Sequence, residues 1–83
     1  MEYIYNPRGV CSRQFVFDIE ESKIMNVRII GGCPGNLLGI SALLKGMDID
    51  DAITRMKGIR CGAKPTSCPD QIAKGLESYK NQL

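Results

Sequence analysis

Residues 11–30 read CSRQFVFDIEESKIMNVRII, and this stretch decides the fold. In 11–20 and again in 24–30, apolar residues alternate with polar ones, which is the period of a strand that buries one face. The side chains expected on the buried face are Phe15, Phe17, Ile19, Met25, Val27 and Ile29. Only Glu21-Ser22-Lys23 separates the two runs. The sequence therefore predicts a β-hairpin with a tight connection.

Segments on either side of this hairpin add one strand and three helices. Residues 1–5 favour a strand, which the turn sequence Asn6-Pro7-Arg8-Gly9 closes. After residue 30 the apolar period becomes helical, with helices expected over 37–44, over 48–56 and from Pro69 onward. Gly46 and Gly58 are suited to end the first two helices. We predict a single domain, 1–83, with an α+β fold: a small antiparallel three-stranded sheet followed by three helices packed on one face.

The composition limits the function classes. A chain of 83 residues with 43% hydrophobic residues and no Trp supports one thin, aliphatic core. A net charge of +2 does not predict a nucleic-acid partner. No apolar stretch is long enough to span a bilayer, and Met1-Glu2-Tyr3 does not begin a signal peptide, so we expect a cytoplasmic protein with no membrane partner. In that compartment four cysteines favour metal binding or redox chemistry over permanent disulfides.

Two cysteines are expected at helix starts. Cys33 stands between Gly32 and Pro34, where the second long strand gives way to the first helix. Cys68 directly precedes Pro69, which suits the first turn of the last helix. Backbone N–H groups at a helix start favour negative charge, and so favour a thiolate that can attack or bind a metal.

The other two cysteines have different surroundings. Cys61 lies in a glycine- and proline-rich loop, and Lys57, Arg60 and Lys64 near it in sequence favour a thiolate. Cys11 has the same strand parity as the apolar residues of its strand. It is therefore either a fourth ligand or a small core side chain.

Three kinds of thiol chemistry stay open. Successive cysteines are separated by 21, 27 and 6 residues, and the chain has no Cys-x-x-Cys pair and no histidine. A four-thiolate site for zinc or an iron–sulfur cluster would thus have to be gathered by the fold. The third chemistry is dithiol–disulfide exchange, with Cys61 and Cys68 as the redox candidates because they are nearest in sequence.

Two alternatives do not depend on the cysteines. Gly32, Gly35 and Asn36 at a helix start, together with Arg60 and Lys64, would suit a phosphate-bearing ligand such as a nucleotide or a flavin cofactor. The loop lacks the Gly-Lys-Ser/Thr ending of a P-loop. The other alternative is a non-catalytic interaction domain. Without histidine or a recognisable carboxylate pair, a self-contained hydrolase is not expected.

The segment Thr66-Ser67-Cys68-Pro69-Asp70 resembles the TSCPD-domain family, which is named for that pentapeptide. The resemblance extends over 9–12, 31–37, 57–62 and 66–76. Such domains also occur at the C-terminal end of adenosylcobalamin-dependent ribonucleotide reductases, where the cysteines are thought to bind metal or relay reducing equivalents. The resemblance implies that Cys11, Cys33, Cys61 and Cys68 form the site.

The same resemblance implies a stand-alone accessory to ribonucleotide reduction, with a reductase as partner. Eighty-three residues cannot hold the radical-bearing barrel of a complete ribonucleotide reductase, so any redox activity would be that of a dithiol accessory.

Residues 20–56 are similar in layout to the U-type iron–sulfur scaffold proteins: strand, acidic turn, strand, Gly-Gly-Cys loop, helix, Lys-Gly stop and a second acid-capped helix. This likeness implies a related sheet-and-helix architecture and a cluster-assembly protein as another partner. The chain has no histidine to match the scaffold's ligand. A thin core is also compatible with a homodimer, but no stripe of residues identifies an interface from the sequence.

Overall fold

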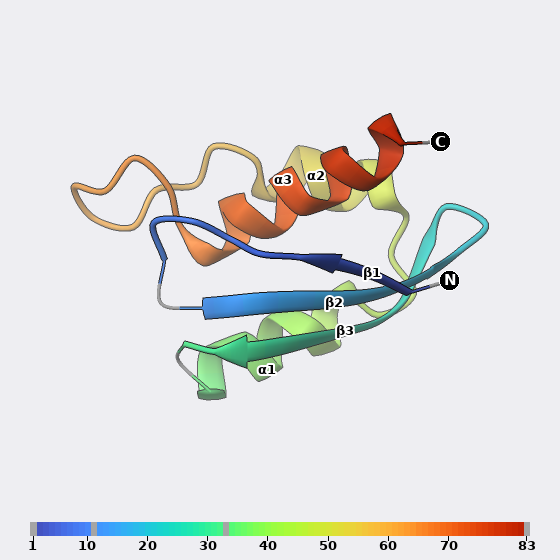
Figure 1. The fold of residues 1–83 in the computed structure, drawn as a ribbon, viewed down its shortest axis with the longest axis horizontal. Coiled ribbons are helices and arrows are strands. Elements are labelled where there is room, and N and C mark those ends of the chain that lie inside the picture. Colours follow the sequence, from blue (N-terminus) through green and yellow to red (C-terminus); the bar gives the residue numbers. More distant parts are fainter. Residues whose placement is uncertain (1, 11, 33, 83) are drawn as a thin grey trace.

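The computed structural model describes residues 2–10, 12–32 and 34–82. Three strands precede three helices, and the strands form one antiparallel sheet in the order β1-β2-β3 (Figure 1). The elements are β1 (Glu2–Tyr5), β2 (Ser12–Glu20), β3 (Lys23–Gly31), α1 (Pro34–Leu44), α2 (Ile49–Met56) and α3 (Cys68–Asn81). The predicted α+β fold is confirmed. None of the described helices is long and apolar enough to cross a membrane.

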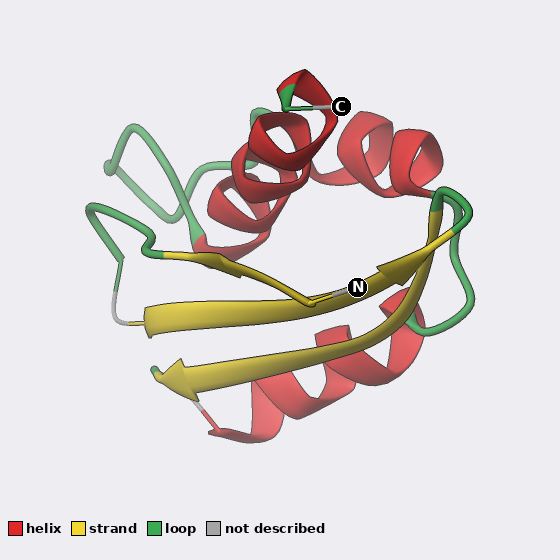
Figure 2. Ribbon diagram, turned by 45° about the vertical axis from the view of Figure 1, so that its right-hand side comes forward, coloured by secondary structure: helices red, strands yellow, loops and turns green. Residues whose placement is uncertain are grey.

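One face of the sheet carries the core. Phe17 pairs directly with Val27, so these two side chains share a face, and Phe17 has no exposed surface. A Cβ added at Gly75 of α3 would lie 3.0 Å from the Phe17 ring, which shows how closely α3 approaches this face. Val27 also lines a pocket with Leu37 of α1. Both helices therefore cover the same face, α1 along β3 and α3 near β2 (Figure 2).

The helices contribute to a single core. The core side chains from the helices include Leu44 of α1, Ala52 and Met56 of α2, and Ile72, Ala73, Leu76 and Tyr79 of α3. Fully burying an aliphatic or aromatic side chain stabilises a fold by about 1.5–3 kcal/mol. The buried side chains of β2 and β3 therefore pack against those of the three helices in one core, and the sheet and the helices stabilise one another.

Met25 is not on the buried face, and that prediction is wrong. Its side chain is 45% exposed, whereas Ile24 is fully buried. The pairing passes from Asp18 with Asn26 to Ile19 with Ile24, which leaves Met25 as the extra residue of a β-bulge. Because strand side chains alternate with period two, one extra residue moves every residue beyond it to the other face.

The β2–β3 connection is a two-residue loop. Glu20 pairs with Lys23, and the residues between them, Glu21 and Ser22, have φ of 51° and 66°. Positive φ at both central residues is the geometry of a type I′ turn, whose twist matches that of a hairpin. Neither residue is glycine or asparagine, so both adopt a left-handed conformation at a cost of about 1–2 kcal/mol each.

The chain between α1 and α2 is hydrogen-bonded to the turn end of this hairpin. The Ile24 N–H donates to the Met47 carbonyl at 2.9 Å, and the Gly46 N–H donates to the Ile24 carbonyl at 2.7 Å. Gly46 has φ of +85° and ends α1 as predicted. Asp48 then caps α2 by accepting the Asp50 N–H at 3.0 Å.

We expect the double change Glu21→Asn with Ser22→Gly to stabilise the protein by about 1 kcal/mol, because Asn-Gly adopts the type I′ turn with less strain. Urea unfolding followed by circular dichroism measures this gain. Glu20→Asn on the neighbouring strand is the control and should bring no gain, since its backbone is already extended. Equal or lower stability of the double variant would contradict the strained turn.

Candidate functional site

The predicted thiol residues that the structure describes lie at one end of the sheet. Figure 1 shows the chain before β2, the end of β3 and the loop before α3 gathered at the end opposite the β2–β3 hairpin. Cys61 belongs to that loop and Cys68 is the first residue of α3. Cys11 and Cys33 lie outside the described residues. Their neighbours Val10, Ser12 and Gly32 are described.

The segment 66–70 fastens the loop to the start of α3. The Asp70 carboxylate is almost fully buried and accepts the Gly58 N–H at 2.8 Å and the Thr66 hydroxyl. Ser67 is the N-cap: its Oγ accepts the Asp70 N–H at 3.2 Å and donates to the Ile59 carbonyl at 2.6 Å. Two buried side chains thus hold both ends of the loop 58–67 against the first turn of α3.

The surroundings of Asp70 favour its charged form. The Thr66 hydroxyl bond, then the Gly58 N–H and the Lys74 ammonium 3.5 Å away, hold the pKa of the Asp70 carboxyl below its ordinary value, while burial acts in the opposite direction. A hydrogen-bonded buried carboxylate stabilises the structure that supplies its donors. The Asp70 carboxylate therefore holds the loop in place through its hydrogen bonds.

Gln71 connects this cluster to the N-terminal loop. Its Nε2 donates to Thr66 Oγ1 at 3.0 Å, and its Oε1 accepts the Arg8 N–H at 3.1 Å. At Gly9, whose φ is +74°, an added Cβ would lie 3.3 Å from the Thr66 methyl group. The chain before β2 is thereby held against the same turn of α3 as the loop.

The loop brings Cys61 close to Cys68. The Cys61 N–H donates to the Thr66 carbonyl at 3.2 Å, and the Cys61 carbonyl accepts the Lys64 N–H at 3.0 Å, with Gly62 at φ of +59° inside the turn. Cys61 is exposed and Cys68 is partly buried. Both line one cavity of about 50 Å³, whose wall consists of Gly9, Val10, Cys61, Lys64, Thr66, Ser67 and Cys68.

The ends of β2 and β3 meet this site from the sheet. Ser12 was not predicted as a site residue from the sequence. It is buried, and its Oγ lies 3.2 Å from Cys68 Sγ. Gly32 lies against Ser12: a Cβ added there would come within 2.9 Å of Ser12 Oγ and 2.6 Å of a Leu37 methyl group. Ser12 falls within the segment 9–12 that carries the family resemblance, but its contact with Cys68 spans 56 positions of the chain and has no local signal.

The described residues thus include two of the four predicted ligands, close together. Within 2–10, 12–32 and 34–82 no group of three or more His, Cys, Asp or Glu side chains could hold a metal ion. Asp70 is occupied by its hydrogen bonds. A metal site here would need the two cysteines that the structure does not describe.

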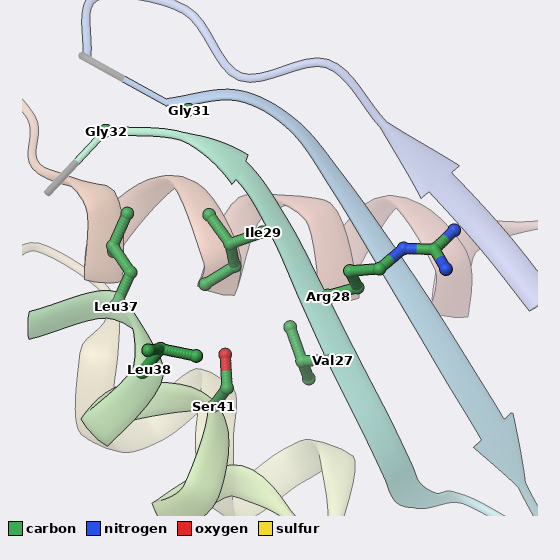
Figure 3. Close-up of a pocket in the computed structure, with 8 residues that line it drawn as sticks. All are labelled: Val27, Arg28, Ile29, Gly31, Gly32, Leu37, Leu38 and Ser41. Atoms are coloured by element: carbon green, nitrogen blue, oxygen red, sulfur yellow. The ribbon is translucent and has the colours of Figure 1, made fainter. Parts of the chain in front are cut away.

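The residues of the predicted phosphate site do not line one cavity. Gly32 lines a pocket of about 310 Å³ between α1 and β3, with Leu37, Leu38 and Ser41 on one side and Val27 and Ile29 on the other (Figure 3). Lys64 lines the separate cavity beside Cys68, and Arg60 is exposed. Lys57, from the same basic stretch, pairs with Glu77 at 2.9 Å. Gly35 and Asn36 belong to α1.

The family comparison gives one finding. The family model described as the TSCPD domain matches residues 3–80, which is nearly the whole chain. A search of curated proteins and a search of solved structures each found no match. The likeness to the U-type iron–sulfur scaffold proteins stays a prediction.

We expect Asp70→Asn to lower the free energy of unfolding by about 1–3 kcal/mol at pH 7, because an amide nitrogen would face donors that the carboxylate now accepts. The folded pKa of Asp70 is lowered, so its contribution is present above the unfolded pKa and is lost as the pH falls through the folded pKa. The difference between wild type and variant should therefore shrink below about pH 4. Urea unfolding at a series of pH values measures it.

The control for this series is Asp51→Asn, at an exposed carboxylate in the first turn of α2. It should change stability by less than about 0.5 kcal/mol. A difference between wild type and Asp70→Asn that is independent of pH would contradict the assigned role of the carboxylate.

A second prediction concerns the contact between Gly32 and Ser12. Gly32→Ala should destabilise the fold by about 1–2 kcal/mol, because φ is +82° and the new methyl group would meet Ser12 and Leu37. Gly39→Ala is the matched control, since a Cβ at Gly39 in α1 meets no atom within 4 Å and should gain up to about 1 kcal/mol of helix propensity. Thermal unfolding of the two variants should move in opposite directions; a shift in the same direction contradicts the packing described.

Proposed function

The chain belongs to the TSCPD domain family, and on that premise we propose that it is a small metal-binding module whose cysteine thiolates meet at the loop end of the sheet. One observation carries the proposal. Cys61 and Cys68 line the same small cavity, although one lies in a loop and the other opens a helix. Cys61 is exposed, so the cavity can receive a ligand from solvent.

The neighbours of the other two cysteines support a site of four. Val10, which precedes Cys11, lines the cavity, and Ser12, which follows it, contacts Cys68. Gly32, which precedes Cys33, lies against Ser12. We propose Cys11 and Cys33 as the remaining ligands, as the family resemblance implies.

The donor set suits a thiophilic metal. With no histidine in the chain, four thiolates are the ligands of a tetrahedral zinc site or of an iron–sulfur cluster. Ser12 would donate its hydroxyl to the Cys68 thiolate and orient it from outside the ligand shell. A bound metal would cross-link the two loops, the end of β3 and α3, and so stabilise a chain with a thin core.

Dithiol exchange is the second candidate, and the shared cavity of Cys61 and Cys68 favours it as well. In that case the Cys61 thiolate would attack a disulfide of a partner protein, and Cys68 would then displace the partner's thiolate. The partner's disulfide gains two electrons, and the pair becomes a disulfide. A ribonucleotide reductase with oxidised cysteines is the partner that this dithiol chemistry would serve. A cluster-assembly protein is the partner that the metal-binding proposal suggests.

Metal analysis of protein purified without oxygen tests the proposal. We expect about one zinc per chain, or iron with inorganic sulfide, and we expect each of Cys11→Ser, Cys33→Ser, Cys61→Ser and Cys68→Ser to lose most of it. Chelation of the metal should lower the melting temperature of the wild-type protein.

The control is Ser22→Ala in the hairpin at the opposite end of the sheet, which should keep its metal. A metal-free protein in which mild oxidation joins Cys61 to Cys68 would replace the metal site with the dithiol function. Four thiols that neither bind metal nor react would reject both.

A further inference from the structure

Helix α1 has an outer face without charge. Its sequence, PGNLLGISALL, contains no Asp, Glu, Lys or Arg, whereas α2 and α3 both carry charged residues. Leu38 and Leu43 are 70% and 76% exposed, more than any other large apolar side chain in the described ranges. Leu37 and Leu44 already make the contacts of α1 with the core. Two leucines are thus exposed to solvent on a helix whose outer face has no charged side chain.

The exposed residues of α1 form a pattern with its own symmetry. They are Leu38, Gly39, Ala42 and Leu43, which cover about 140° of the helix circumference at 100° per residue. The order is large, small, small, large, centred between residues 40 and 41. When two such helices run antiparallel about a twofold axis at that centre, each Leu38 lies opposite the other helix's Leu43, and each Gly39 lies opposite Ala42. We name these four residues the α1 face.

Hollows flank the α1 face on both sides. The pocket between α1 and β3 measures about 310 Å³ and includes Leu38 in its wall (Figure 3). A second hollow of about 320 Å³ lies on the side of α2, and it is lined by Ile40, Leu43, Leu44, Met47, Arg55, Met56 and Pro69. A Cβ at Gly39 would meet no atom within 4 Å, so another backbone can approach there. The surface therefore has protruding leucines and recesses that could receive them.

We propose that the α1 face is the interface of a homodimer, in which α1 packs antiparallel to α1 of a second copy. The order of large and small residues selects this occupant, because the α1 face is complementary to itself about a twofold axis, and its lack of charge is compatible with such a pairing. A twofold interface places a surface against itself, so a face with charge of one sign would repel its copy, whereas this face carries none. Burying Leu38 and Leu43 would also add to the apolar area of a small domain. The inference does not depend on the thiol chemistry.

Sedimentation equilibrium over a range of protein concentrations, with a phosphine reductant present to exclude disulfide-linked pairs, tests the dimer. We expect a reversible monomer–dimer equilibrium for the wild-type protein. Leu43→Glu should raise the dimer dissociation constant by about 100-fold or more, because it buries an unpaired charge. The circular dichroism spectrum should not change, since the side chain is exposed. Ile4→Glu is the matched control, at an apolar side chain 52% exposed on β1, and should leave the equilibrium unchanged.

A double variant tests the antiparallel register. Leu38→Glu with Leu43→Lys places a carboxylate of each copy opposite an ammonium group of the other, so it should dimerise more tightly than Leu38→Glu or Leu43→Lys alone. A wild-type protein that stays monomeric at millimolar concentration would overturn the proposal. So would a dimer that Ile4→Glu dissociates and Leu43→Glu does not, since that result would place the interface on the outer face of the sheet. A double variant no tighter than the single ones would overturn the antiparallel pairing.

Discussion

The buried carboxylate of Asp70 is the constraint on which the candidate site depends. It accepts the Gly58 N–H, where α2 has just ended, and the Thr66 hydroxyl, two residues before α3 begins. Within the loop between these points, the Ser67 hydroxyl also donates to the Ile59 carbonyl, main-chain hydrogen bonds close the turn at Cys61, and Cys61 is exposed. A buried charge is costly unless its donors are in place, so the structure that satisfies Asp70 is strongly favoured over others. In that structure Cys61 and Cys68 line the same cavity.

In the pentapeptide Thr66-Ser67-Cys68-Pro69-Asp70, the residues around the cysteine form the start of α3 and hold the loop before it. Thr66 and Asp70 bond to one another, Ser67 caps the helix, and Pro69 occupies its first turn, where the lack of an N–H costs nothing. The Cys68 sulfur lies 3.2 Å from the Ser12 hydroxyl. The residues around Cys68 therefore account for the local geometry of the motif.

The thiol site and the α1 face are connected through Gly32 and Leu37. A Cβ at Gly32 would meet both the Ser12 hydroxyl and a Leu37 methyl group, so the end of β3 joins the surroundings of Cys68 to the first turns of α1. Leu37 faces the core and Leu38, next to it, faces solvent. A partner copy on the α1 face would leave the exposed Cys61 in a different part of the molecule, since Cys61 lies in the loop before α3 (Figure 1).

Local signals in the sequence determined the elements. The alternation of apolar and polar residues predicted the two long strands, Gly46 and Gly58 the ends of two helices, and Pro69 the start of α3. Each of these signals acts within a few residues, so it can be read from one segment. The tertiary structure alone decided that Met25 forms a bulge, that the Ser12 hydroxyl meets Cys68, and that Asp70 fastens the loop of Cys61. The Ser12–Cys68 contact joins residues 56 positions apart, and the Met25 bulge depends on how β3 pairs with β2, so neither can be read from one segment of the sequence.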